Sequence, residues 1–213
     1  MALIIFDFDG VLADTFNDFL QFGQEACDEL GVKHIVKEKD IRNLDPMTFP
    51  SLGRACEVPE QHVNEFVRII LQRIAEMKTP PELFKGMDNI IRRFAANNPV
   101  AIVTTNSSQN VNAFLSEHGL AGCVKAVYGV DTPGSKAQKI SQARDKFSGE
   151  PKQEPVFMVG DSLSDIRAAK EASVTSIAVA WGHQSMEHLL RGDPNHVVNF
   201  PEDLIGVIEK QED

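Results

Sequence analysis

Two aspartates separated by one residue, Asp7 and Asp9, follow an apolar run at residues 3–6. The run shows no polar alternation, which is typical of a central strand of a parallel sheet that is buried on both faces. Carboxylates at the end of a buried strand are costly unless they are paired with cations or bound to a metal. The spacing therefore predicts a site where both carboxylates have a chemical task. A third carboxylate, Asp14, follows at a position that suits either a hinge or a turn.

Polar residues follow other apolar segments of the chain in the same way. The segments at 100–103, 124–128 and 156–159 indicate strands, and each leads into a helix-like segment. In parallel sheets, ligands bind beyond the carboxyl ends of the strands. We therefore expect these loops to meet Asp7 and Asp9 at one edge of the sheet. The loop residues that could take part in chemistry are Thr105, Asn106, Lys136, Asp161 and Asp165.

These residue types suit a phosphate group and a metal ion. Carboxylates offer the oxygen ligands that a hard divalent cation such as Mg²⁺ prefers. Lys136 is an ammonium donor, and Thr105 with the adjoining Asn106 adds neutral donors for phosphate oxygens. Lys136 and one Mg²⁺ together do not balance four carboxylates, so a phosphate could enter only with the cation bound. The four carboxylates are Asp7, Asp9, Asp161 and Asp165.

The segments that hold these residues alternate in type along most of the chain. After residue 99, short apolar runs alternate with amphipathic segments, which indicates βαβ units and a parallel sheet. Ser162 and Asp165 form a capping box at the start of one amphipathic segment. We predict an α/β fold with a doubly wound parallel sheet. The expected helices span 109–118, 135–147, 163–172, 185–191 and 202–210, and further strands lie at 175–179 and 197–198.

Residues 15–81 interrupt the alternation and carry helical signals only. Thr15 and Asp18 form a capping box ahead of a first helix, and apolar residues between Glu60 and Met77 recur with a helical period. This pattern predicts a helical lobe inserted into the α/β unit. The expected units are a core formed by residues 1–14 and 82–213 and a helical cap formed by residues 15–81.

Charge and composition exclude several classes of function. A formal net charge of −10 argues against broad nucleic-acid binding, which requires a basic face. No apolar window reaches the length of a membrane span, and the first residues lack the regions of a signal peptide. Cys27, Cys56 and Cys123 are widely spaced, as is typical of free thiols in a reducing compartment. We expect a cytoplasmic protein with no nucleic-acid or membrane partner.

Four ordered motifs resemble those of the haloacid dehalogenase-like superfamily of phosphohydrolases, in particular its branch with a small helical cap. They are Asp7-Phe8-Asp9-Gly10-Val11, then Thr105, then Lys136, then Gly160-Asp161-Ser162-Leu163-Ser164-Asp165. Lesser matches are Phe84-Lys85-Gly86 and Trp181-Gly182, the second of which is similar to phosphoglycolate phosphatase-like members. The resemblance covers nearly the whole chain and implies a Rossmann-like core with a helical cap.

The resemblance also implies a role for each residue. Asp7 would be the nucleophile that forms an aspartyl-phosphate, and Asp9 would act as general acid and then general base. The catalytic set would be Asp7, Asp9, Thr105 and Lys136. The residues around the substrate phosphate would be Gly10, Thr105, Asn106 and Lys136. The ligands of Mg²⁺ would be Asp7, Asp9 through its backbone carbonyl, Asp161 and, in support, Asp165.

Asp9 also separates branches of this family, because an alkoxide needs a proton to leave and a halide does not. The chain is therefore expected to be a Mg²⁺-dependent phosphatase of a small phosphorylated metabolite, for which phosphoglycolate is suggested by resemblance alone. A phosphomutase would share the same core chemistry, with a sugar phosphate in place of water. A non-catalytic regulator that binds a phosphorylated ligand would need neither Asp7 as nucleophile nor Asp9 as acid.

Some residues keep a structural explanation beside the functional one. Asp165 could serve the helix cap as much as the metal, and His183 could be an ordinary loop residue. Lys139 competes with Lys136, which we prefer because it lies at the start of a helix. After Lys136 the chain departs from the Lys-Pro-x-Pro pattern of several relatives, so the subfamily stays open. The sequence sets neither the oligomeric state nor the substrate; the cap candidates for specificity are Asn17, Arg42, Asn43, Arg54 and Arg73.

Overall fold

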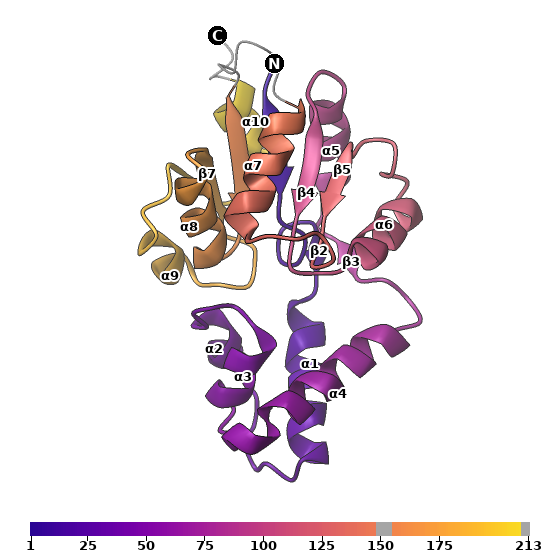
Figure 1. The fold of residues 1–213 in the computed structure, drawn as a ribbon, viewed down its shortest axis with the longest axis vertical. Coiled ribbons are helices and arrows are strands. Elements are labelled where there is room, and N and C mark those ends of the chain that lie inside the picture. Colours follow the sequence, from indigo (N-terminus) through magenta and orange to yellow (C-terminus); the bar gives the residue numbers. More distant parts are fainter. Residues whose placement is uncertain (148–154, 210–213) are drawn as a thin grey trace.

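The computed structural model describes residues 1–147 and 155–209 of the chain. Figure 1 shows an α/β unit joined to a helical unit. The described residues of the α/β unit contain six parallel strands in the order β5-β4-β1-β6-β7-β8. The strands are β1 (Leu3–Phe6), β4 (Val100–Val103), β5 (Ala126–Tyr128), β6 (Val156–Gly160), β7 (Thr175–Val179) and β8 (His196–Val198). The predicted α/β class with a parallel sheet is confirmed.

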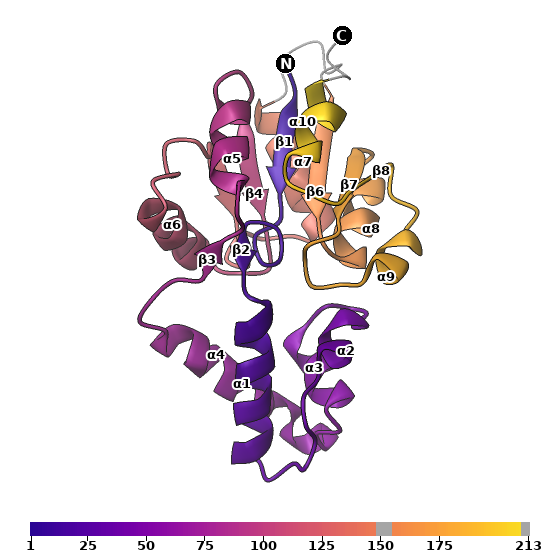
Figure 2. The same cartoon turned by 180° about the vertical axis from the view of Figure 1, so that it is seen from behind.

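Helices cover both faces of this sheet, as Figures 1 and 2 show from opposite sides. Leu3 and Ile5 of β1 pack in one apolar cluster with α7 and α8. Ile4 and Phe6 belong to a second cluster with α5, α6 and α10. Because strand side chains alternate between faces, an unbroken apolar run is buried only when both faces are covered. The helices are α5 (Met87–Ala95), α6 (Ser108–Glu117), α7 (Lys136–Phe147), α8 (Leu163–Glu171), α9 (Met186–Leu190) and α10 (Asp203–Ile208).

The helical unit has an apolar cluster of its own. Phe66 lies at 0% exposure within it, and Gly53 packs flat against the Phe66 ring, so that an added Cβ would lie only 3.0 Å from the ring. Cys27 and Cys56 are buried in the same cluster as free thiols. The elements of this unit are α1 (Phe16–Glu29), α2 (Glu38–Arg42), α3 (Phe49–Ala55), the 3₁₀-helix η1 (Glu60–His62) and α4 (Val63–Glu76).

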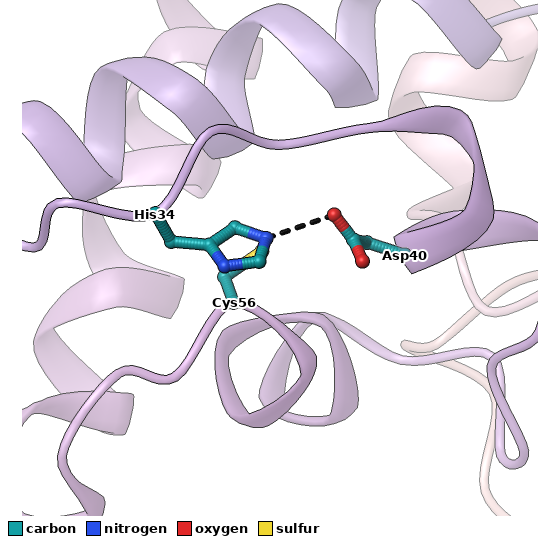
Figure 3. A group of neighbouring side chains, drawn as sticks. All are labelled: His34, Asp40 and Cys56. Atoms are coloured by element: carbon teal, nitrogen blue, oxygen red, sulfur yellow. Dashed lines mark hydrogen bonds and ion pairs between the residues drawn. The ribbon is translucent and has the colours of Figure 1, made fainter.

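A polar group inside the helical unit ties the segment after α1 to α2 (Figure 3). Nε2 of His34 lies 2.9 Å from Oδ2 of Asp40, which also accepts a hydrogen bond of 2.8 Å from the backbone N–H of Lys37. Cys56 packs beside this pair at the end of α3. Because buried polar groups need partners, these contacts account for His34 and Asp40 as structural residues of the helical unit.

A short antiparallel pair of strands, β2 (Ala13–Asp14) and β3 (Glu82–Leu83), carries the two connections between the units. The sequence signals predicted no strand here, because two-residue strands leave no periodic pattern. Asp14 pairs with Glu82 in this ribbon, so its place is the connection itself. The entry and the exit of the helical unit therefore lie side by side.

Local differences from the predicted elements are small and have physical reasons. The capping box at Thr15 is wrong: Thr15 is the N-cap of α1, but its side chain makes no capping hydrogen bond and instead contacts His183. Strand β5 begins two residues later than predicted, at Ala126. Residue 210, the last of the expected final helix, lies outside the described residues, as do 148–154 of the predicted core unit. Among the described helices, none is both long and apolar enough to cross a membrane.

Candidate active site

Side chains from the segments that follow β1, β4, β5, β6 and β7 line one cavity of about 430 Å³ at the carboxyl edge of the sheet, facing the helical unit. The predicted site residues that line it are Asp7, Asp9, Thr105, Asn106, Lys136 and Asp161. Gly10 and Asp165 lie behind this wall, in contact with Asp161 and Lys136 respectively. The convergence follows from the parallel sheet, which brings the ends of β1, β4 and β6 to one edge.

Asp7 is held between the backbone and Lys136. Its Oδ1 accepts a hydrogen bond of 2.8 Å from the N–H of Phe8, and its Oδ2 lies 2.8 Å from Nζ of Lys136. Burial and, after it, the neighbouring Asp165 carboxylate raise the pKa of Asp7 to about 8, against the opposing effect of Lys136. The ammonium group of Lys136 therefore offsets only part of the cost of burying this carboxylate, and a further cation beside Asp7 would favour its ionised form.

Asp9 has one bound and one unpaired oxygen. Its Oδ2 accepts a hydrogen bond of 3.0 Å from Nδ2 of Asn106. Its Oδ1 is buried and has no hydrogen-bond partner among the described residues. Burial raises the pKa of Asp9, with Asn106 acting in the opposite direction. A buried polar atom without a partner is uncommon, and here it belongs to a carboxyl group that lines the cavity.

Asp161 sits in a cradle that only glycine can form. A Cβ on Gly10, whose φ is +77°, would lie 1.9 Å from Oδ2 of Asp161, and a Cβ on Gly182 would lie 2.2 Å from its Cβ. The N–H of Gly10 donates to the carbonyl of Ala13 at 2.9 Å rather than into the cavity. Gly10 therefore has a steric role in this structure, and its predicted contact with substrate gains no support from the geometry.

Lys136 bridges two carboxylates as the first residue of α7. Its Nζ pairs with Oδ2 of Asp7 at 2.8 Å and with Oδ1 of Asp165. The second oxygen of Asp165 accepts from the backbone N–H and Oγ of Ser162, at 3.0 and 2.6 Å. The capping box predicted for Ser162 and Asp165 is thus confirmed. Asp165 serves the helix and positions Lys136 at the same time.

Of the remaining candidate hydrogen-bond donors, Thr105 and Asn106 line the cavity and Lys139 does not. Lys139 donates from Nζ to the carbonyl of Gly129 at 2.6 Å and does not line the cavity, which favours Lys136 as the phosphate-binding lysine. Thr105 is exposed to the cavity. Asn106 lines the cavity and donates a hydrogen bond from its amide to Asp9, so it orients the predicted acid.

His183 belongs to the site, although its sequence context left it open. Its backbone N–H donates to Oδ2 of Asp161 at 2.7 Å, its Nδ1 lies 3.1 Å from the same oxygen, and its Nε2 lies 3.1 Å from Oγ1 of Thr15. Burial, the largest single effect, would lower the pKa of His183, but the carboxylates of Asp161, Asp9 and Asp7 together raise it. The only sequence signal for this residue was its place directly after the Trp181-Gly182 match.

The carboxylates fit a divalent cation. Asp7, Asp161 and Asp165 are buried and bring ligand oxygens within 4.8 Å of one another. An all-oxygen donor set of this kind suits Mg²⁺. The raised pKa of Asp7 points the same way, because a nearby cation would offset the cost of its buried charge. Both oxygens of Asp165 already accept hydrogen bonds, so direct ligation by Asp165 stays a prediction.

Comparison with known proteins places this arrangement in a family. Residues 4–179 match the model of the haloacid dehalogenase-like hydrolase family. The chain belongs to that family, which confirms the resemblance and the prediction of a hydrolase.

Relatives of similar length agree with this membership. A phosphoglycolate phosphatase from Synechococcus elongatus is 24% identical over 98% of this chain and 97% of its own. A pyrophosphatase from Listeria innocua is 24% identical over 100% of this chain and 98% of its own. The structure of a haloacid dehalogenase-like family hydrolase from Streptococcus pneumoniae superposes with a TM-score of 0.83 at 22% identity, covering 96% of this chain and 97% of that one. The last comparison supports the fold.

Proposed function

We propose that this chain is a Mg²⁺-dependent phosphatase that hydrolyses a small phosphorylated metabolite through an aspartyl-phosphate intermediate. The observation that carries the proposal is the meeting of Asp7, Asp9 and Lys136 in one cavity beside Asp161. A nucleophile, an acid and a phosphate-binding cation are the groups that phosphoryl transfer between a substrate and an enzyme requires. The names of the two phosphatase relatives support the same reaction class.

In the first half of the reaction, a carboxylate oxygen of Asp7 attacks phosphorus and the bond to the leaving oxygen breaks. The protonated carboxyl group of Asp9 donates its proton to that leaving alkoxide. The raised pKa of Asp9 favours the protonated form, and its unpaired Oδ1 is available to donate. Thr105 and Lys136 hold the phosphoryl oxygens during the transfer.

In the second half, the Asp9 carboxylate takes a proton from water, whose oxygen attacks phosphorus. The bond between phosphorus and Asp7 breaks, and inorganic phosphate and the free Asp7 carboxylate result. Asn106, which donates to Oδ2 of Asp9, keeps the carboxyl group aimed in both halves. One residue therefore serves as acid and then as base, as microscopic reversibility requires.

The residues proposed to hold Mg²⁺ are Asp7, Asp161 and the backbone carbonyl of Asp9, with Asp165 in support. When bound, the ion supplies positive charge that keeps Asp7 ionised and offsets the charge of the phosphoryl oxygens. Gly10 and Gly182 keep Asp161 in place for this purpose. We further propose that residues 15–81 act as a cap over a core of residues 1–14 and 82–213, joined through the β2–β3 ribbon.

The test is hydrolysis of phenyl phosphate by the purified chain with Mg²⁺. We expect Asp7→Asn to abolish release of phosphate and chelation to abolish it reversibly. Exchange of label between the positions of a sugar phosphate, with little free phosphate released, would instead identify a phosphomutase. Hydrolysis that survives both the Asp7→Asn substitution and chelation would overturn the proposal.

A further inference from the structure

The wall that the helical unit contributes to the cavity is apolar. Every helical element that reaches the cavity presents hydrophobic side chains to it, and Thr48 is the one polar side chain of the described residues on this wall. Phe19 and Phe49 form an edge-to-face pair there, with ring centroids 5.2 Å apart. Representative members of the wall are Phe19, Ile41, Met47, Phe49, Leu71 and Ile74.

All charged side chains among the described lining residues belong instead to the α/β unit, at the phosphate end of the cavity. They are Asp7, Asp9, Lys136, Asp161 and the titratable His183. Each of these already has a partner or a proposed role in phosphoryl transfer. The cavity therefore has a charged end for one phosphate and an opposite end with no charge to offer.

Arg42 contacts the site loop but does not line the cavity. Its Nη1 lies 3.4 Å from the carbonyl of Gly182 and 3.5 Å from that of His183, and its Nε pairs with Glu38 at 3.0 Å. Its guanidinium also lies 4.4 Å from the centroid of the Phe16 ring. The guanidinium of Arg42 therefore joins the helical unit to the loop after β7 and does not face a ligand in the cavity.

The other cap candidates for specificity are also absent from the cavity wall. Arg54 forms an ion pair with Glu60, and Arg73 forms ion pairs with Glu25 and Glu29. Asn17 and Asn43 do not line the cavity either. The polar residues that the sequence offered for substrate recognition thus lie elsewhere, and apolar residues take their place.

We propose that the phosphate ester hydrolysed here carries an uncharged apolar group, alkyl or aryl, rather than a second anionic group. This inference rests on the proposed phosphatase function. A carboxylate or a second phosphate at the apolar end would lose its water without gaining a partner, which makes its burial costly. A hydrocarbon group would gain from leaving water at the same place. Thr48 could in addition satisfy one hydroxyl group of the substrate.

The entrance of the cavity has an exposed apolar side chain on each of the two units. Leu71 of α4 and Val130, from the loop between β5 and α7, are 52% and 65% exposed and both line the cavity. Exposed large apolar side chains that gather at a cavity entrance are typical of binding surfaces for apolar ligands. The entrance and the interior therefore select the same class of substrate.

The test compares unbranched alkyl phosphates from ethyl to pentyl, because their leaving groups differ little in chemistry. We expect kcat/KM to rise by about threefold to fourfold for each methylene until the cavity is filled. Phenyl phosphate should exceed 4-carboxyphenyl phosphate by about 100-fold or more, and phosphoglycolate and pyrophosphate should be poor substrates. All assays use the full chain with Mg²⁺.

A matched pair of variants tests the apolar wall directly. Leu71→Lys places a cation at the rim, and Leu190→Lys places one on α9, where the leucine is similarly exposed at 55% but does not line the cavity. We expect Leu71→Lys to raise the ratio of kcat/KM for phosphoglycolate over ethyl phosphate by about tenfold, and Leu190→Lys to leave it unchanged.

The outcomes separate this inference from the function on which it rests. Phosphate release from phosphoglycolate or pyrophosphate at rates above those of the longest alkyl phosphate, with a flat alkyl series, would overturn the apolar substrate class alone. A wild-type chain that hydrolyses none of the esters would overturn both proposals. A Leu71→Lys effect that Leu190→Lys reproduces would show that the wall does not select against charge.

Discussion

Substitution of Gly182 by alanine tests the cradle of Asp161 more sharply than removal of the carboxylate would. The added Cβ would lie 2.2 Å from Cβ of Asp161, 2.6 Å from its Oδ2 and 2.6 Å from the carbonyl oxygen of Gly10. Ordinary contacts between carbon atoms need about 3.5 Å, so the loops that carry these atoms must separate by about 1 Å. None of the three atoms lies at the end of a long side chain that could rotate away.

A displacement of that size matters because metal ligands tolerate only about 0.2 Å, and misplacement of a reacting group by about 1 Å costs on the order of 100-fold in rate. We therefore expect Gly182→Ala to lower kcat/KM for phenyl phosphate by about 100-fold or more. The same crowding should lower the free energy of unfolding by about 1–3 kcal/mol. Titration with Mg²⁺ should show a higher half-saturating concentration, which a purely global loss of stability would not produce.

Gly122→Ala is the matched control, because no atom lies within 4 Å of its added Cβ. Both variants are compared in initial rates at saturating Mg²⁺ and in thermal unfolding. If Gly182→Ala remains folded and its kcat/KM lies within about threefold of that of Gly122→Ala, the steric reasoning is refuted, because the expected displacement of Asp161 should cost about 100-fold.

Three other substitutions test the charge balance at Asp7, the support of the proposed metal site and the core of the helical unit. With a chelator present, the wild type keeps the stability that protonated Asp7 allows below about pH 4 and loses it as the pH rises to about 8, because the folded-state pKa of Asp7 is raised. The melting temperature of Asp7→Asn minus that of the wild type should therefore increase across this pH range. A difference that does not change with pH would contradict this prediction. His183→Ala should raise the half-saturating Mg²⁺ concentration by about 10- to 100-fold, whereas His62→Ala on the exposed 3₁₀-helix should not. Phe66→Ala should lower the free energy of unfolding by about 3–5 kcal/mol, and an equal loss in Phe200→Ala, whose ring is 66% exposed, would argue against it.

The sequence predicted the polar edge of the sheet well because its signals are local. An unbroken apolar run followed by Asp7 and Asp9 predicts a buried strand with two carboxylates at its end. In the structure the strand is buried and the two carboxylates line one cavity. Lys136 was also predictable, since a lysine at the first residue of a helix points back toward the strand ends.

What the sequence could not predict depends on contacts between distant segments. His183 joins the site through Asp161 and also contacts Thr15, which lies 168 residues away in the chain. That contact also explains the error at Thr15, whose hydroxyl was expected to cap α1. Leu71 illustrates the same limit within a helix: the helical period between Glu60 and Met77 does not show that this residue lies at the cavity rim.

The loop after β7 links the proposed metal site to the position of the helical unit. Its backbone at Ser185 donates to the carbonyl of Arg42 at 3.3 Å, and the side chain of Gln184 donates to the carbonyl of Leu44. One residue earlier, His183 contacts both Asp161 and Thr15, the residue that opens α1.

A bidentate ion pair between Arg167 and Asp45, at 2.7 and 2.9 Å, adds a contact between the units beyond this loop. The groups that bring the apolar wall over the cavity are thus bonded to the same loop that supports Asp161. Movement of the helical unit away from the sheet edge would break contacts on both sides of His183, the residue whose backbone N–H donates to Asp161.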